Sequence, residues 1–215
     1  MANSKKLGKY IVIEGNDGTG KTTQVELLAN FLRQNGEIVQ IVEEPGSDNP
    51  NNTTPVANEL RNAIKNGSLE RSPEINVLLF SAARRELWQQ KIQPALSRGE
   101  IVLASRNYFS TLAYQGRGEG INANEIIRLT KLFTDERYMH PDSLVVLIAS
   151  HDTRKTRIAN RGTPKNPDTF ESRGQDFQDT VNEAYEKLAS EHNLPTINAS
   201  QSIDEIQRQI QTLIL

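Results

Sequence analysis

The sequence predicts an α/β fold in which five parallel strands form one sheet with helices on both faces. Two observations carry this prediction. Short apolar runs, rich in β-branched residues, alternate along the chain with longer segments of helical periodicity. Strands this short, when they alternate with helices, are typical of a parallel sheet that is covered on both sides.

Each element follows from a local pattern. The strands are predicted where apolar runs end at turn signals, at residues 10–13, 38–42, 101–104, 144–149 and 195–198. A helix is predicted from just after Gly20 to Gly36, and glycines also end the next two helices. Those two and the remaining helices are expected at 56–65, 73–98, 108–116, 122–134, 152–161, 173–191 and 202–214.

The 215 residues predict a single domain over 1–215. Two segments stand apart within it. A turn-rich stretch near 46–55 is expected to be a mobile surface loop. A segment near 161–172, with glycine, two prolines and several charges, is expected to close over a site as a short lid.

Composition excludes several classes of protein. No apolar run approaches the roughly 20 residues of a membrane span, and the apolar stretch after the basic N-terminus is too short for a secretory signal. We therefore expect a cytoplasmic protein without a membrane partner. A net charge of −2 supplies no field for long nucleic acids. With no cysteine and three scattered histidines, the chemistry has to come from carboxylates, cations, hydroxyls or a bound ion.

A complete phosphate-binding motif lies between the first strand and the first helix. The motif G-x-x-x-x-G-K-[ST] is matched in full by Gly15-Asn16-Asp17-Gly18-Thr19-Gly20-Lys21-Thr22. Glycines let backbone N–H groups turn toward a phosphate, Lys21 bridges the β- and γ-oxygens, and the Thr22 hydroxyl can ligate Mg²⁺. The alternative is a glycine turn that binds nothing, but motif and context agree. The sequence therefore predicts a P-loop NTPase.

A P-loop alone does not name a reaction, because kinases, switches and motors share it. Further motifs extend over nearly the whole chain: Glu44-Pro45-Gly46, Leu79-Phe80-Ser81-Ala82-Ala83-Arg84, Arg106 with Ser110-Thr111-Leu112-Ala113-Tyr114-Gln115-Gly116, and the Asp168-x-x-Glu171 pair. With these motifs the sequence resembles the thymidylate kinase family. The resemblance implies that ATP donates its γ-phosphoryl group to the 5′-phosphate of dTMP with Mg²⁺, in a protein that is commonly a homodimer.

The resemblance also implies which residues bind ATP and take part in phosphoryl transfer. ATP is expected on Gly15, Asn16, Asp17, Gly18, Thr19, Gly20, Lys21, Thr22 and Thr23. Catalytic roles fall to Lys21, Arg106, Arg161 and Asp17. Gly18 stands where some members carry an arginine, so the cation for the transferred group is expected from the lid, from Arg161 or alternatively Arg157 or Lys165. Mg²⁺ is expected at Thr22 and Glu171, with Glu14, Glu44 or Asp168 as further positions for its waters.

For the acceptor, the resemblance implies a pocket with separate places for phosphate, sugar and base. Arg61 and Arg106 would grip the 5′-phosphate, because guanidinium forks bind its oxygens bidentately. Asp17 would accept the 3′-hydroxyl, and Tyr114 would crowd the 2′ carbon. Phe80 would stack on thymine and Arg84 would reach its O4. The rest of the expected acceptor site is Glu44, Pro45, Thr111 and Gln115.

Each of these residues also has a plainer interpretation. The carboxylate of Asp17 can stabilise the loop as an Asx turn. Phe80 can be an ordinary core residue, and Tyr114 a half-buried amphipathic one. Arg61 and Arg106 can form surface salt bridges, and Thr111 can serve as a helix cap.

The sequence departs from the family pattern in three places. The family usually has Asp-Arg after the third strand, whereas this chain has Ser105-Arg106, so a carboxylate on the metal side is missing. Glu43 replaces the arginine that often precedes Glu-Pro-Gly. The lid motif Asp-Arg-x-Glu becomes Asp168-Thr169-Phe170-Glu171. The first departure predicts weaker Mg²⁺ binding unless another carboxylate compensates.

Two other functions remain open. One is a kinase for a related pyrimidine deoxynucleotide such as dUMP. The other is a P-loop switch whose nucleotide state controls a protein partner. The sequence has neither an Asp-x-x-Gly element after a strand nor an Asn-Lys-x-Asp guanine reader, which disfavours the switch.

Overall fold

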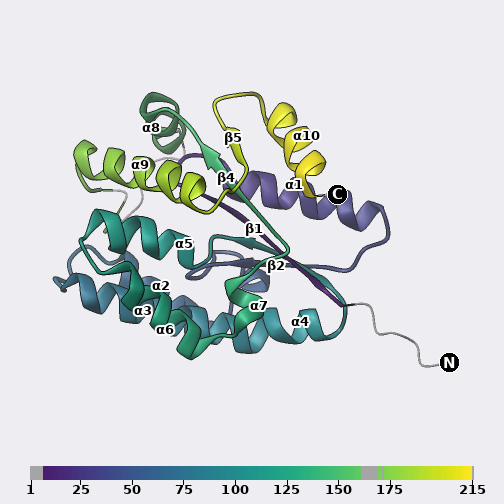
Figure 1. Ribbon diagram of the computed structural model, residues 1–215, viewed down its shortest axis with the longest axis horizontal. Coiled ribbons are helices and arrows are strands. Elements are labelled where there is room, and N and C mark those ends of the chain that lie inside the picture. Colours follow the sequence, from purple (N-terminus) through teal and green to yellow (C-terminus); the bar gives the residue numbers. More distant parts are fainter. Residues whose placement is uncertain (1–6, 161–168, 171, 215) are drawn as a thin grey trace.

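The computed structural model describes residues 7–160, 169–170 and 172–214, and Figure 1 shows its arrangement. Five strands form one sheet in the order β2-β3-β1-β4-β5, and every neighbouring pair is parallel. The strands are β1 (Lys9–Gly15), β2 (Val39–Glu43), β3 (Ile101–Ser105), β4 (Ser143–Ile148) and β5 (Thr196–Asn198). The predicted five-stranded parallel α/β sheet is confirmed.

Helices connect the strands on both sides of the sheet. They are α1 (Lys21–Gln34), α2 (Pro55–Lys65), α3 (Pro73–Leu87), α4 (Gln93–Ser97), α5 (Tyr108–Thr111), α6 (Ala123–Phe133), α7 (Glu136–Met139), α8 (His151–Ala159), α9 (Gln175–Glu191) and α10 (Ile203–Ile214). Two segments are π-helical, η2 (Trp88–Ile92) and η3 (Leu112–Gly118), and η1 (Pro50–Asn52) is a single 3-10 turn. The sequence did not predict η1 or α7, because each is one short turn without helical periodicity.

Alternate residues of β1 enter two different hydrophobic cores. Ile11 and Ile13 pack with α1 and α10, whereas Tyr10 and Val12 pack with the helices on the other face. This is the period of two that a strand imposes on its side chains. Figure 1 shows α1 and α10 together on one side of the sheet, and α3, α4 and α6 on the other.

The carboxyl ends of β1, β2 and β3 meet at one edge of the sheet. Ser105, the last residue of β3, pairs with Ile13 of β1 and with Glu43, the last residue of β2. The phosphate-binding motif leaves the sheet at this edge, at Gly15. In open parallel sheets ligands bind outside these strand ends, so the fold places the expected site here.

The structure describes the expected loop near 46–55 but little of the expected lid near 161–172. Most of the expected lid lies outside the described residues, and with it Arg161, Lys165, Asp168 and Glu171. The stretch near 46–55 is described and is hydrogen-bonded. The Asn58 side chain brackets Ser47, accepting from its N–H at 3.0 Å and donating to its carbonyl oxygen at 2.9 Å, and the Thr54 hydroxyl caps α2. The mobility of this loop stays a prediction.

Within the described part of the chain, none of the helices combines the length and apolarity that a membrane span needs.

Candidate active site

The phosphate-binding loop has the backbone that its glycines predict. Gly15, Gly18 and Gly20 have φ values of 142°, 82° and 91°, a region that favours glycine. A Cβ on Gly15 would lie 2.4 Å from the carbonyl oxygen of Leu147, and a Cβ on Gly18 would lie 2.7 Å from that of Arg154. A side chain at either position would therefore push the loop off the neighbouring backbone.

The N-terminus of α1 is left open for an anion. Gly20 precedes the helix, no side chain of the described residues caps it, and its first turn carries no acidic residue. Lys21 is buried beside it, and its Nζ donates to the carbonyl oxygen of Asn16 at 2.9 Å. Uncapped N–H groups, the helix dipole and a buried ammonium together suit the binding of a phosphate.

The hydroxyl of Thr22 fits a place at a Mg²⁺ ion. Thr22 is exposed in the first turn of α1 and lines the pocket next to Lys21. A hydroxyl oxygen beside a phosphate site is the kind of ligand that Mg²⁺ accepts, together with phosphate oxygens and water. The chemistry of this part of the loop therefore suits a metal–nucleotide complex.

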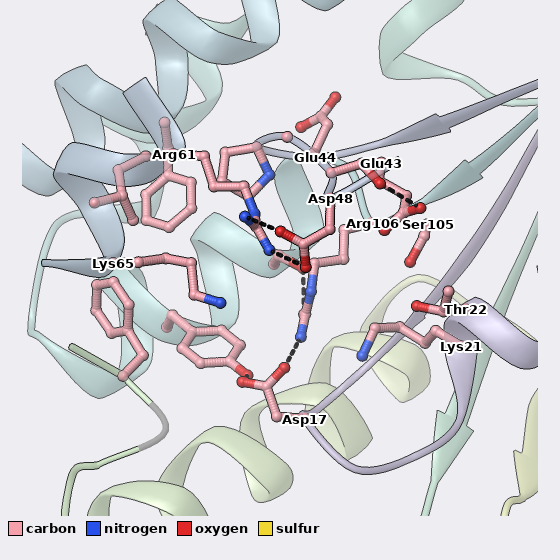
Figure 2. Close-up of a pocket in the computed structure, with 18 of the residues that line it drawn as sticks. Asp17, Lys21, Thr22, Glu43, Glu44, Asp48, Arg61, Lys65, Ser105 and Arg106 are labelled. Carbon is pink, nitrogen blue, oxygen red and sulfur yellow. Dashed lines mark hydrogen bonds and ion pairs between the residues drawn. The ribbon is translucent and has the colours of Figure 1, made fainter. Parts of the chain in front are cut away.

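A pocket of about 610 Å³ opens from the phosphate-binding loop toward α2 and α3. Many of the predicted site residues line it, as Figure 2 shows for those that it labels. They are Asp17, Gly18, Lys21, Thr22, Glu44, Pro45, Arg61, Phe80, Arg106, Tyr114 and Gln115. Residues up to 98 places apart in the chain thus share one cavity with two cationic ends, Lys21 at one and Arg61 at the other.

Arg106 is held rigidly at the end of β3. Its φ of 75° is left-handed, which is uncommon for a residue with a side chain and is typical of functional sites. Its Nη1 donates to the carbonyl oxygen of Gly15, to Ser110 and to Tyr185, at 2.9 to 3.1 Å. Its Nη2 donates to Asp17. The guanidinium is therefore fixed by hydrogen bonds within the protein.

Asp17 carries its charge inside the site. Burial raises the pKa of its carboxyl, but attraction to Arg106 and Lys21 outweighs burial and holds the pKa well below its usual value. The second carboxylate oxygen accepts from the Tyr114 hydroxyl at 2.7 Å. Asp17 is thus an anion that ties a cation and a phenol to the loop.

Arg61 enters the pocket from α2 and is also paired with an internal carboxylate. Its Nη1 and Nη2 donate to the two oxygens of Asp48, at 2.9 and 3.2 Å. The Asp48 side chain is 90% exposed, whereas that of Arg61 is 17% exposed. The partner is therefore at the surface while the guanidinium lines the cavity.

Arg84 lies on α3 one turn after Phe80, and its side chain is fully buried. Its Nε donates to Glu44 at 3.2 Å and to the Tyr138 hydroxyl at 3.0 Å, and its Nη2 donates to the Thr111 hydroxyl at 2.8 Å. Within the described residues its Nη1 has no hydrogen-bond partner. A buried guanidinium nitrogen without a partner is costly. Arg84 and Thr111 are not among the residues that line the pocket, whereas Phe80 is.

Two of the carboxylates expected to position metal-bound water are occupied elsewhere. Glu44 accepts from Arg84 on one oxygen and from the Tyr138 hydroxyl on the other. Glu14 accepts from two backbone N–H groups at the start of α5 and from the hydroxyls of Ser110 and Tyr185. Their roles toward the metal stay predictions without support in this geometry.

Tyr114 stands in the π-helical segment η3 and is fixed from two sides. Its hydroxyl donates to Asn16 at 2.8 Å and to Asp17, and its ring packs edge-on against Phe170 with centroids 5.9 Å apart. Phe170 also packs against Phe80. The next residue, Gln115, is buried and donates to Glu119 at 3.1 Å. An aromatic wall therefore closes the pocket between the loop and α3.

The remaining predicted residues lie around the loop. Arg157 donates to the carbonyl oxygens of Ala199 and Thr19, so it flanks the outside of the motif. Thr19 is buried, and its hydroxyl donates to the carbonyl oxygen of Asn16. Thr23 is exposed in the first turn of α1.

Comparison with known proteins identifies the family. A sequence model of the family described as thymidylate kinase matches residues 13–210. The chain belongs to the thymidylate kinase family. Thymidylate kinase of Nitrosospira multiformis is 34% identical over 209 residues, which cover 96% of this chain and 97% of that protein. The probable thymidylate kinase of Caldivirga maquilingensis is 33% identical over 95% of this chain and 92% of its own.

A solved structure supports the same family. The crystal structure of thymidylate kinase from Ehrlichia chaffeensis superimposes with a TM-score of 0.72 at 26% identity, over 95% of this chain and 97% of that one. The predicted P-loop NTPase fold and the phosphotransferase class of a thymidylate kinase, with ATP as donor and dTMP as acceptor, are thereby confirmed.

Three residues that hold side chains of the site in place were not predicted. Tyr138 on α7 and Tyr185 on α9 hold Glu44, Arg84 and Arg106 in place. Asp48 pairs with Arg61. The two tyrosines carry no local signal, because each acts on residues far away in the chain. For Asp48 the signal was its position in the turn-rich loop just before α2.

Proposed function

We propose that the residues of this pocket carry out the thymidylate kinase reaction as a phosphate-to-phosphate transfer between its two cationic ends. One observation carries the assignment of the roles. The open N-terminus of α1 with Lys21, and the two guanidinium groups of Arg61 and Arg106, line the same cavity (Figure 2). Two phosphate-binding ends in one pocket suit a donor phosphate at one end and an acceptor phosphate at the other.

The donor is ATP, held by the loop from Gly15 to Thr23. The N–H groups before α1 and the Lys21 ammonium bind the β- and γ-phosphate oxygens, where negative charge increases during transfer. Thr22 would hold Mg²⁺, which supplies charge neutralisation on those phosphates. Lys21 is buried beside the open helix end and held by the carbonyl oxygen of Asn16, so the fold itself positions the ammonium for ATP.

The acceptor is dTMP, with its 5′-phosphate at Arg61 and Arg106. Arg106 already makes four hydrogen bonds to the protein and keeps its charge next to Asp17. Because a phosphate acceptor is an anion at neutral pH, the reaction needs positioning more than a general base. The arginines therefore orient the attacking oxygen, and Asp17 keeps Arg106 in place besides accepting the sugar hydroxyl.

The base lies between Phe80 and the buried donor of Arg84. Phe80 offers a half-buried aromatic face in the pocket. Arg84 has one nitrogen without a protein partner, and Thr111, which accepts from the same guanidinium, lies beside it. A carbonyl at the edge of thymine would satisfy this nitrogen. Tyr114, held by Asn16 and Asp17, forms the wall at the 2′ side of the sugar.

A coupled assay that follows ADP formation tests the function and its closest alternative. The purified protein is given MgATP with dTMP, dUMP, dCMP, dGMP or no acceptor. We expect dTMP to give the highest kcat/KM and the background without acceptor to be small. Equal turnover with and without nucleotide would favour the switch, and a higher kcat/KM for dUMP would favour the related pyrimidine kinase.

A homodimer is part of this proposal. Ile75 and Leu78 are exposed on α3, and Leu132 is exposed on the neighbouring helix α6. A second copy of the chain would bury these side chains. In sedimentation velocity, Leu78→Glu is expected to convert a dimer to a monomer. The matched change Leu213→Glu, at an exposed leucine on α10, is expected to leave the dimer intact.

The catalytic cation of the lid, Arg161 or its alternatives, and the metal role of Glu171 stay predictions, as does the cytoplasmic location.

A further inference from the structure

Ser105 stands where the family usually has a carboxylate, and a carboxylate lies beside it on the adjacent strand. Ser105 is the last residue of β3, and Glu43 is the last residue of β2 and its partner in the register. Glu43 is one of the departures from the family pattern, since it stands where an arginine is frequent. The two departures are therefore adjacent in space although they lie 62 residues apart in the chain.

The period of the strands directs both side chains toward the start of α1. Ile41 and Leu103, two residues earlier on β2 and β3, belong to the core that α1 covers. Glu43 and Ser105 share that parity and so continue the same face at the carboxyl end. Glu44 has the opposite parity, which is why it joins Arg84 and Tyr138 on the other side.

Figure 2 shows the result at the pocket. The labelled side chains of Glu43, Ser105 and Thr22 follow one another along one wall, with Lys21 next to Thr22. All four line the cavity. The carboxylate of Glu43 thus lies on the side of the pocket where the Thr22 hydroxyl is exposed.

Hydrogen bonds hold the carboxylate of Glu43 in place and leave one of its oxygens able to accept more. Its Oε1 accepts from the Ser47 hydroxyl at 2.8 Å and from the Asn52 amide at 2.9 Å. Its Oε2 accepts no hydrogen bond from the described residues. Polar groups that hold a carboxylate in one orientation are typical of the outer shell of a metal site.

Three other described carboxylates near the loop are engaged. Glu14 binds the start of α5, Glu44 binds Arg84, and Asp17 binds Arg106 and Tyr114. Glu26 also lines the pocket, but it lies four residues after Thr22, one turn further along α1 from the open helix end. Among these described carboxylates, Glu43 has an oxygen that accepts no hydrogen bond from the described residues, and it also lies on the face of the sheet that α1 covers.

We propose that Glu43 replaces the carboxylate that Ser105 lacks, and accepts hydrogen bonds from water on the Mg²⁺ of bound MgATP. The proposal rests on the proposed function, because it takes the loop with Thr22 as the MgATP site. It changes the expectation from the sequence alone. Ser105 does not weaken Mg²⁺ binding under this proposal, because the carboxylate is supplied by the neighbouring strand instead.

The test measures metal affinity without turnover. The full-length protein is saturated with a non-hydrolysable ATP analogue, and Mn²⁺ binding is followed by electron paramagnetic resonance, with Mg²⁺ as competitor. We expect Glu43→Gln to weaken metal binding by about tenfold, the lower end of what outer-shell changes cost. Glu26→Gln, which removes a carboxylate from the same pocket, is the matched control and should leave metal binding unchanged.

Ser105→Asp supplies a second, independent readout. In the wild-type background it should change metal affinity less than twofold, because Glu43 already fills the role. In the Glu43→Gln background it should restore most of the lost affinity. A tenfold gain from Ser105→Asp alone would overturn the proposal, as would unchanged metal affinity in Glu43→Gln or a loss in Glu26→Gln instead.

A purely structural role for Glu43 in holding Ser47 and Asn52 predicts a different pattern. Glu43→Gln would then lower thermal stability while leaving metal affinity unchanged, and Ser105→Asp would rescue neither. Failure of the proposed function would appear separately, as absence of dTMP-dependent turnover in the wild-type enzyme at saturating Mg²⁺.

Discussion

Asp48 holds the guanidinium of Arg61 in the same two-pronged way in which that guanidinium would hold a phosphate. Both terminal nitrogens of Arg61 donate to the two carboxylate oxygens. Guanidinium binds carboxylate and phosphate with the same fork geometry. Asp48 thus pairs with the guanidinium that we propose binds the acceptor phosphate, and under that proposal an incoming nucleotide has to displace or share this carboxylate.

Removing this anion should tighten acceptor binding. Because Asp48 is mostly exposed, the ion pair is worth at most about 1 kcal/mol, so Asp48→Asn is expected to lower the Kd for dTMP by about two- to fivefold. Isothermal titration calorimetry at low and high salt checks this, and the gain should shrink as salt screens the pair. Glu59→Gln, on the exposed side of the same helix, controls for loss of a nearby charge. An unchanged Kd would show that the pair does not compete with the acceptor.

Replacement of Lys21 tests the donor site. Lys21→Ala removes the ammonium beside the open end of α1 and should lower kcat at least about 100-fold, since transfer depends on charge stabilisation at the phosphates. Circular dichroism should show an intact fold. Lys131→Ala, at an exposed lysine on α6, should retain full activity. Substantial turnover by folded Lys21→Ala would place the donor phosphates elsewhere.

The sequence was most informative where the chemistry is local. The phosphate-binding loop, with its glycines, Lys21 and Thr22, is contiguous, so its geometry follows from the motif. The five strands follow from short apolar runs. Their order does not, and it is the order that makes Glu43 and Ser105 neighbours.

Contacts between distant parts of the chain could not be predicted in the same way. Glu44 was expected near metal-bound water, but the fold turns it toward Arg84, 40 residues away, and Tyr138, 94 residues away. Such pairings depend on how the helices α3 and α7 pack on the sheet. The alternation of side chains along a strand was enough to assign Glu43 and Glu44 to opposite faces of the sheet. It did not show which of the two faces the metal would lie on, because that depends on where α1 packs.

The sugar preference should depend on the ring of Tyr114 and not on its hydroxyl. Tyr114→Ala removes the wall, so kcat/KM for the ribonucleotide should rise relative to that for dTMP. Tyr114→Phe keeps the wall but loses the bonds to Asn16 and Asp17. It should retain the preference and lower the free energy of unfolding by about 1 to 3 kcal/mol, because a buried acceptor on Asn16 and a partly buried one on Asp17 each lose a donor. Equal use of both sugars by the wild-type enzyme would contradict this role of Tyr114.

Acid should weaken the fold partly through Asp17. Arg106 and Lys21 hold the pKa of this carboxyl below its unfolded value of about 3.9. A lowered pKa means that the folded state binds fewer protons, so the stabilisation is fully present well above pH 4 and is lost as the pH falls through and below that value. In urea unfolding, Asp17→Asn should therefore be less stable than wild type at pH 7, and the difference should narrow at pH 3. In the Arg106→Gln background, the gap that Asp17→Asn causes should change less between pH 7 and pH 3, because only Lys21 then lowers the pKa of the carboxyl. A gap between wild type and Asp17→Asn that stays constant from pH 7 to pH 3 would mean that the ion pair with Arg106 does not contribute to stability.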